Sequence, residues 1–259
     1  MRGIQIGSVL GIPIRLNLTF LLILPIFAWL IGSDVAQLAV VLSDLIGMQL
    51  EPTALTGGLR PWILGSAAAI GLFVCVLLHE FGHSIVAMRF GYEIDSITLW
   101  LLGGVASFRE MPEDWREELA IAVAGPAVSV GIGVLAYAVV LLLPSTAQSA
   151  LFVMGYLALT NIVLAAFNLL PGFPMDCVRV LRALLARTRP HARATQLAAE
   201  VGKAFAILLG FVGLFMNIFL LALAFFIYMG ASSESQQTVM KAAFEGVTVR
   251  DIMTPQPRL

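Results

Sequence analysis

Long apolar stretches dominate this sequence of 259 residues and restrict the environments in which it can fold. Hydrophobic residues make up 59% of the chain and charged residues only 12%, against roughly a quarter in an ordinary soluble domain. Several stretches reach or approach the length of about 20 residues that a helix needs to cross a hydrocarbon core. The sequence therefore predicts an all-α polytopic membrane protein in contact with the lipid bilayer.

About six transmembrane helices are expected. The first four apolar runs cover residues 16–31, 62–90, 119–143 and 150–170, and the last of these ends at a break formed by Pro171, Gly172 and Pro174. Residues 204–229 suit one tilted span or, counted from 197, two short spans that meet near Met216 and Asn217. The amphipathic segment 35–50 is expected to lie at the membrane interface. Residues 92–108 alternate as a strand does and predict a short membrane-associated β element.

Basic residues indicate the orientation. They are concentrated before the first run, after the second and fourth runs and near the C-terminus, whereas residues 144–149 carry none. The positive-inside rule places these basic segments in the cytoplasm and leaves Arg60 as the exception. With both termini cytoplasmic the number of spans must be even, which favours six. We expect a multi-pass protein of the cell membrane.

Charge and cysteine content exclude several classes of function. The formal net charge is −1 and no basic run is present, so a nucleic-acid partner is not expected. Cys75 and Cys177 are the only cysteines, and neither belongs to a CxxC pair. The sequence therefore predicts neither a disulfide framework nor a thiolate zinc site.

The motif His79-Glu80-Phe81-Gly82-His83 lies within the second apolar run. At a spacing of four residues the two imidazoles share one helix face and can both reach one Zn²⁺ ion, while Glu80 can act as a general base on water. The alternative is that the histidines only form hydrogen bonds in the core. Ionisable side chains are costly in the middle of a membrane and usually mark function, which favours the metal site.

A catalytic zinc site normally needs a third protein ligand. His191 lies in an Arg-rich segment, and its location favours a solvated loop residue. Asp176 follows the Pro171 to Pro174 break, where a carboxylate could turn back towards the bundle interior. It could equally be the N-cap of a helix that starts at Cys177. The residues alone leave this choice open.

Four motifs in order resemble the site-2 protease family of intramembrane zinc metalloproteases. They are His79 to His83, Leu102-Gly103-Gly104-Val105-Ala106, Ala124-Gly125-Pro126, and Asn168-Leu-Leu-Pro-Gly-Phe-Pro-Met-Asp176. The resemblance implies that Asp176 is the third zinc ligand and that Asn161 helps to bind the substrate carbonyl. It also implies that residues 101–106, with Leu101, Leu102, Gly103, Gly104 and Val105, form an edge that pairs with an unwound substrate. Asn161 could instead form a hydrogen bond between helices.

One departure from the family pattern stands next to the expected ligand. The family has Gly-Gly after the aspartate, whereas this chain has Cys177-Val178. Cysteine and valine resist backbone angles that glycine adopts, so the loop is expected to be shifted or less active. Cys177 could ligate or inhibit the metal, although an inert, small apolar residue is the favoured interpretation.

The resulting hypothesis is hydrolysis of peptide bonds within transmembrane segments of substrate proteins. A transporter with an ion or proton pathway through the same polar cluster is the main alternative. A catalytically dead membrane scaffold is a further alternative, because Cys177 and Val178 stand where the family has two glycines.

The C-terminal residues suggest a second region. Residues 249–255 resemble the start of a CBS domain, a cytoplasmic module that pairs to bind nucleotides. We therefore expect a membrane protease domain over residues 1–230, followed at 231–259 by a linker and a truncated CBS domain. The missing part would bind an adenine nucleotide.

Overall fold

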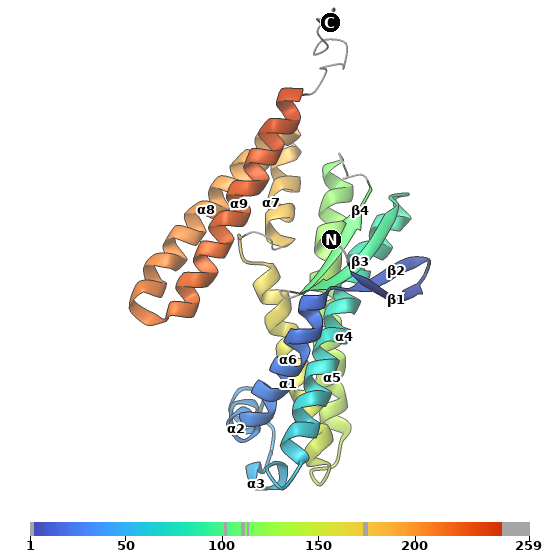
Figure 1. The fold of residues 1–259 in the computed structure, drawn as a ribbon, viewed down its shortest axis with the longest axis vertical. Helices are drawn as coiled ribbons and strands as arrows, with labels where there is room; N and C mark the ends of the chain where they lie inside the picture. The colour runs from blue at the N-terminus through green and yellow to red at the C-terminus, as the bar shows by residue number, and fades with distance from the viewer. Residues whose placement is uncertain (1–2, 101–102, 110–111, 113, 173–175, 245–259) are drawn as a thin grey trace, which may run out of the picture. The chain divides into compact units, whose positions relative to one another are not determined.

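The computed structural model describes residues 3–100, 103–109, 112, 114–172 and 176–244, and the chain divides into two compact units, Met1–Leu169 and Leu170–Leu259. The first unit contains β1 (Ile4–Val9), β2 (Ile12–Leu16), α1 (Leu18–Ser33), α2 (Val35–Ile46), α3 (Pro52–Leu55), α4 (Arg60–Arg89), β3 (Ile94–Trp100), β4 (Gly103–Phe108), α5 (Trp115–Leu142) and α6 (Gln148–Asn168). The second contains α7 (Asp176–Ala186), α8 (His191–Met216) and α9 (Ile218–Phe244) (Figure 1).

Four helices in the described part of the chain are long and apolar enough to cross a membrane, namely α4, α5, α6 and α8. Helices α1 and α2 pass the same test as a pair, bent by 74°, which raises the number to as many as five. The polytopic membrane class is confirmed, and the count of six remains a prediction. The expected break near Met216 and Asn217 is confirmed, because α8 ends at Met216 and α9 begins at Ile218.

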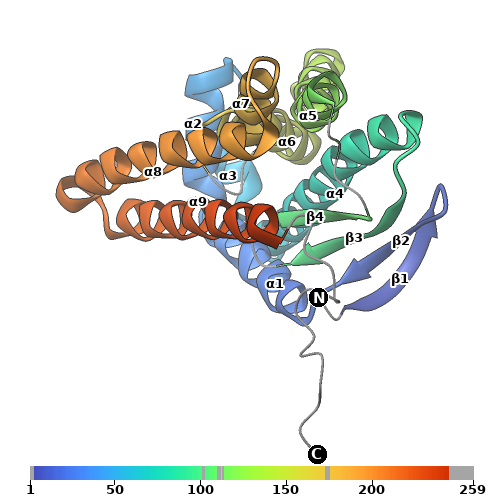
Figure 2. The same cartoon turned by 90° about the horizontal axis from the view of Figure 1, so that it is seen from above.

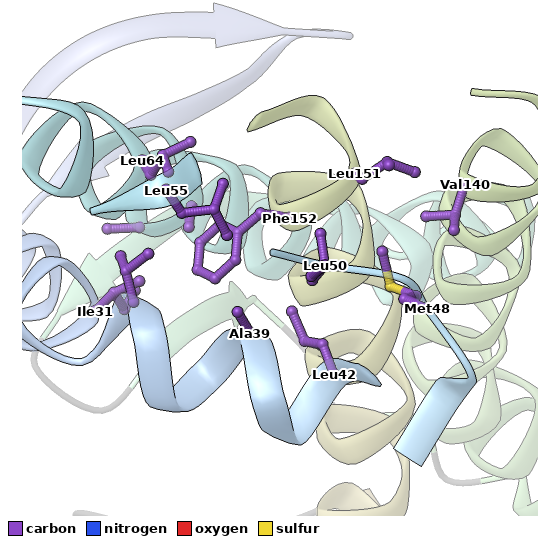
Figure 3. Close-up of a cluster of buried hydrophobic side chains, with 13 residues drawn as sticks. Ile31, Ala39, Leu42, Met48, Leu50, Leu55, Leu64, Val140, Leu151 and Phe152 are labelled. Carbon is purple, nitrogen blue, oxygen red and sulfur yellow. The ribbon is translucent and has the colours of Figure 1, made fainter. Parts of the chain in front are cut away.

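A buried apolar cluster holds the helices of the first unit together. Phe152 of α6 is fully buried, and around it lie Ile31 of α1, Leu42 of α2 and Leu64 of α4 (Figure 3). Close backbone contact makes this packing feasible between α1 and α4. A Cβ atom at Gly65 would lie only 2.3 Å from the Ala28 carbonyl oxygen, so a larger residue there would force the two helices apart.

The strands form one sheet in the order β1-β2-β3-β4, which Figures 1 and 2 both show on one side of α4. β2 pairs in parallel with β3, and the other two pairs are antiparallel. β4 is therefore an edge strand of the sheet in the described residues. This outcome agrees with the β element expected at residues 92–108, although Leu101 and Leu102 lie outside the described residues.

The N-terminal hairpin of β1 and β2 was not expected from the sequence. Its turn uses Leu10 and Gly11, both with positive φ (53° and 82°), as the two-residue turns of β-hairpins require. The sequence signal for this hairpin is the alternation of isoleucines with other residues on both sides of Gly11. The β element expected at residues 92–108 is therefore part of a larger sheet, in which β1 and β2 precede α4 and β3 and β4 follow it.

In the second unit, α8 and α9 lie side by side and antiparallel, with a sharp turn at Asn217 (Figures 1 and 2). The Asn217 side chain accepts a hydrogen bond from the Phe219 N–H and so caps the start of α9. The segment 249–255, which resembles a CBS domain, lies outside the described residues.

Candidate active site

His79 and His83 are buried on one face of α4, the longest helix of the described chain. Their ring centroids are 4.9 Å apart and the rings are inclined at 80° to one another. The two Nε2 atoms are 3.2 Å apart. The spacing of four residues on a helix thus brings two nitrogen atoms to the same point, as the motif predicted.

Helix α5 fixes the other nitrogen atom of each ring. His83 Nδ1 lies 2.7 Å from the Ile121 carbonyl oxygen, which can only accept, so this nitrogen carries the proton and donates. His79 Nδ1 lies 2.9 Å from the Ser129 hydroxyl oxygen. With His79 in the same tautomer, both Nε2 lone pairs face each other. A cation between them would remove this repulsion, and such Nδ1 partners are usual for metal-bound histidines.

Gly125 provides the space in which the imidazoles meet. A Cβ atom at residue 125 would lie 2.1 Å from His83 Nε2 and 2.7 Å from His79 Nε2. Every other residue type would therefore collide with both rings. This steric requirement explains the glycine of the Ala124-Gly125-Pro126 motif.

The geometry suits zinc. Two nitrogen ligands at about 2.0–2.1 Å from a tetrahedral ion are about 3.3 Å apart. The 3.2 Å between the two Nε2 atoms is close to this value. The two histidines could therefore hold Zn²⁺ through Nε2 without a large movement.

Glu80 follows His79 and is half-buried. The edge strand β4 passes directly beside it, since a Cβ atom at Gly104 would lie 2.4 Å from Glu80 Cγ and 3.2 Å from its Oε1. The backbone of Gly104 thus lies within contact distance of the predicted general base. Gly103 has a φ of 133°, which also favours glycine.

Asn161 is fully buried on α6, and its amide donates to the Leu157 carbonyl oxygen at 2.8 Å. Its Oδ1 atom, which can only accept, has no hydrogen-bond partner among the described residues. The hydrogen bond to Leu157 stays within α6, so both expected roles of Asn161 remain predictions.

Asp176, Cys177 and His191 belong to the second unit. Asp176 is the first residue of α7, and His191 is the first residue of α8 rather than a loop residue. Burial, followed by the neighbouring Asp176 carboxylate, raises the pKa of the Cys177 thiol. This shift disfavours the thiolate form of Cys177 in the metal-free chain, and the inert role of Cys177 remains a prediction.

The sequence did not reveal the roles of Ser129, Ile121 and Gly125. In the sequence, Gly125 stands out only as part of the Ala124-Gly125-Pro126 motif, and Ser129 belongs to none of the four motifs. A carbonyl group such as that of Ile121 leaves no signature in a side-chain motif. The spacing of four residues between Gly125 and Ser129 could have indicated one shared face of α5 directed at the histidines.

A helical membrane protein with two converging imidazoles beside a carboxylate defines a buried metal centre of hydrolytic type. Comparison with known proteins identifies the class further. The model of Peptidase family M50 matches residues 67–146 and 144–209.

A zinc metalloprotease of Methanocaldococcus jannaschii is 36% identical over 261 residues, which cover 98% of this chain and 67% of the relative. Relatives from Synechocystis and Mycobacterium tuberculosis are each 33% identical, and this chain spans 65% and 64% of their lengths. The solved structure of the site-2 protease from Methanocaldococcus jannaschii matches with a TM-score of 0.58 and 34% identity, covering 90% of this chain and 95% of that one.

The chain therefore belongs to Peptidase family M50, the family of the site-2 proteases. Membership makes it an intramembrane zinc metalloprotease by class, with zinc as its cofactor. The resemblance inferred from the four sequence motifs is confirmed.

We predict that Gly125→Ala weakens zinc binding roughly 100-fold, because the added methyl group occupies the space of the two Nε2 atoms. Gly131→Ala is the matched control, since it lies on the same helix with no atom within 4 Å of an added Cβ. Zinc affinity is measured by chelator competition on purified protein. Equal affinities in the two variants would contradict the assignment of Nε2 as the metal-facing atom.

We predict that Gly104→Ala retains zinc but lowers peptide hydrolysis roughly 100-fold, since displacing a catalytic group by about 1 Å can cost this much. Gly7→Ala in β1 is the control, because an added Cβ there meets nothing within 4 Å. Zinc content and cleavage of a membrane substrate are measured together. Full activity in Gly104→Ala would show that β4 does not constrain Glu80.

Proposed function

We propose that this chain hydrolyses peptide bonds inside the transmembrane segments of other membrane proteins, with Glu80 as general base. The observation that carries the proposal is the pair of Nε2 atoms 3.2 Å apart on a buried face of α4, with the Glu80 carboxylate on the residue next to His79. His79 and His83 supply two zinc ligands, and Asp176 supplies the third.

Zinc, when bound, polarises the scissile carbonyl and lowers the pKa of water. Glu80 then removes a proton from the attacking water through a carboxylate oxygen and transfers it to the leaving amine. Ser129 and the Ile121 carbonyl orient the two imidazoles so that their Nε2 atoms remain available. The buried position of both histidines limits access of bulk water.

Asp176 is the proposed third ligand because catalytic zinc sites use three protein ligands and keep one open position. Its place at the start of α7, directly after a proline-containing segment, supports this role. The substitution of Cys177 and Val178 for glycines leaves α7 helical from Asp176 onward.

A substrate helix must unwind before hydrolysis, since its carbonyl groups are used in its own hydrogen bonds. We propose that the free edge of β4 binds the unwound segment by strand addition. Two features support this step: β4 is an edge strand, and its Gly104 lies against Glu80. Asn161 would help to bind the substrate carbonyl, through its second amide N–H rather than through Oδ1. Leu101, Leu102 and Val105 would extend the same edge.

The orientation of the chain is part of the proposal. Six spans with both termini cytoplasmic would place residues 93–114, which contain β3 and β4, and the Arg-rich segment 179–193 in the cytoplasm. A CBS pair after residue 249 would lie on the same side and bind an adenine nucleotide.

A transporter and an inactive scaffold are the alternatives. Membership in a peptidase family favours hydrolysis over both. Transport also gives no reason for a carboxylate beside the two imidazoles to contact an edge strand.

We predict that Glu80→Gln retains zinc and loses hydrolysis by about 100-fold or more, because an amide cannot accept the proton of water. Asp176→Asn should instead lose zinc affinity. For each variant, metal content is measured together with cleavage of a transmembrane substrate in detergent or vesicles. Cleavage by Glu80→Gln at the wild-type rate would refute the assigned base.

We predict that Val105→Pro lowers cleavage about fivefold at normal zinc content, since proline removes one donor, worth about 1 kcal/mol, from the edge. The control is Ile6→Pro in β1, at the irregular register between Gln5 and Gly7 on the opposite edge of the sheet. Undiminished cleavage by a zinc-loaded Val105→Pro would remove the strand edge from the mechanism.

A further inference from the structure

The second unit contains a buried ion pair that the proposed mechanism does not use. Arg182 of α7 donates from an Nη atom to Glu234 Oε1 of α9 at 2.9 Å. The Arg182 side chain is 6% exposed and that of Glu234 is 32% exposed. A guanidinium group this deeply buried requires a charged partner, so the pair fixes which part of α9 lies against α7.

A second contact links α9 to the segment before α7. A Cβ atom at Gly172 would lie 3.0 Å from Ile227 Cγ2, which shows that the Gly172 backbone packs directly on this side chain. Ile227 is fully buried. Glu234 lies seven residues after Ile227, two turns along the helix, so both contacts come from one face of α9.

The two contacts stand on either side of Asp176. Gly172 precedes it by four residues, and Arg182 follows it by six within the short helix α7. The Arg182–Glu234 pair joins α7 to α9, while α8 packs along α7 as well. The orientation of α7, and with it the position of its first residue Asp176, therefore depends in part on α9.

We propose that Arg182 and Glu234 are positioning residues for Asp176, and that their ion pair sets the zinc affinity of the site by fixing α7 on α9. This inference rests on the proposed function, in which Asp176 is the third zinc ligand. It assigns neither residue a contact with zinc or with substrate.

The test measures zinc affinity by chelator competition on the purified full chain, together with the visible absorption spectrum of the cobalt-loaded protein. Glu234→Gln keeps the size of the side chain and removes its charge, and Arg182→Met removes the other charge. Each should weaken zinc binding about tenfold, as is typical when a group that orients a ligand is lost. The cobalt spectrum should change with them, because it reports ligand geometry.

Charge reversal separates positioning from general stabilisation. The double variant Arg182→Glu with Glu234→Arg restores the pair and should recover at least half of the loss in zinc affinity on a logarithmic scale. Glu200→Gln, an exposed carboxylate on α8, is the matched control and should bind zinc as the wild type does. If Arg182→Met does not accumulate, Glu234→Gln carries the test by itself.

Asp176→Asn is measured in parallel to separate the two claims. Zinc affinity lost in Asp176→Asn but unchanged in Glu234→Gln and Arg182→Met would overturn the positioning role and leave the third ligand intact. Wild-type zinc affinity in Asp176→Asn would overturn the ligand assignment and this inference with it. Failure of the charge reversal to restore affinity would also overturn the inference.

Discussion

The approach of two imidazole nitrogens to 3.2 Å inside a membrane helix is the constraint on which the rest of the site depends. When both Nδ1 atoms carry the proton, the two Nε2 lone pairs at this distance repel each other unless a cation lies between them. Their approach is enforced from α5, where Ser129 and the Ile121 carbonyl hold the opposite ring nitrogens and Gly125 leaves room for the rings. A cation between the two Nε2 atoms would be held by both rings, and ionisable groups retained within so apolar a chain usually mark function.

The same helix brings the metal site and the sheet together. α4 carries both histidines and Glu80, and β4 passes so close to Glu80 that only glycine fits at residue 104. Chemistry and substrate binding are thus proposed to meet at one contact between a helix and an edge strand. A substrate extended along β4 would pass beside the base, whereas a helical one would keep its carbonyl groups hidden.

The parts of the fold that the sequence predicted are those with a local signature. The spacing within the motif at His79, the break at Asn217 and the alternation before Phe108 each follow from neighbouring residues. The hairpin at Leu10 and Gly11 had a local signature too, but it was hidden beside a much stronger apolar run. Gly125, Ile121 and the Arg182 pair with Glu234 could not be predicted, because their roles arise only when distant helices pack.

Zinc X-ray absorption spectroscopy on the purified chain tests the central claim most directly, since it reports which atoms bind the metal. The account predicts a first shell of nitrogen and oxygen at about 2.0–2.2 Å, with the outer-shell scattering of two imidazole rings. It predicts no sulfur, although Cys177 adjoins the proposed ligand Asp176. A sulfur shell at about 2.3 Å, or scattering from only one imidazole, would contradict it.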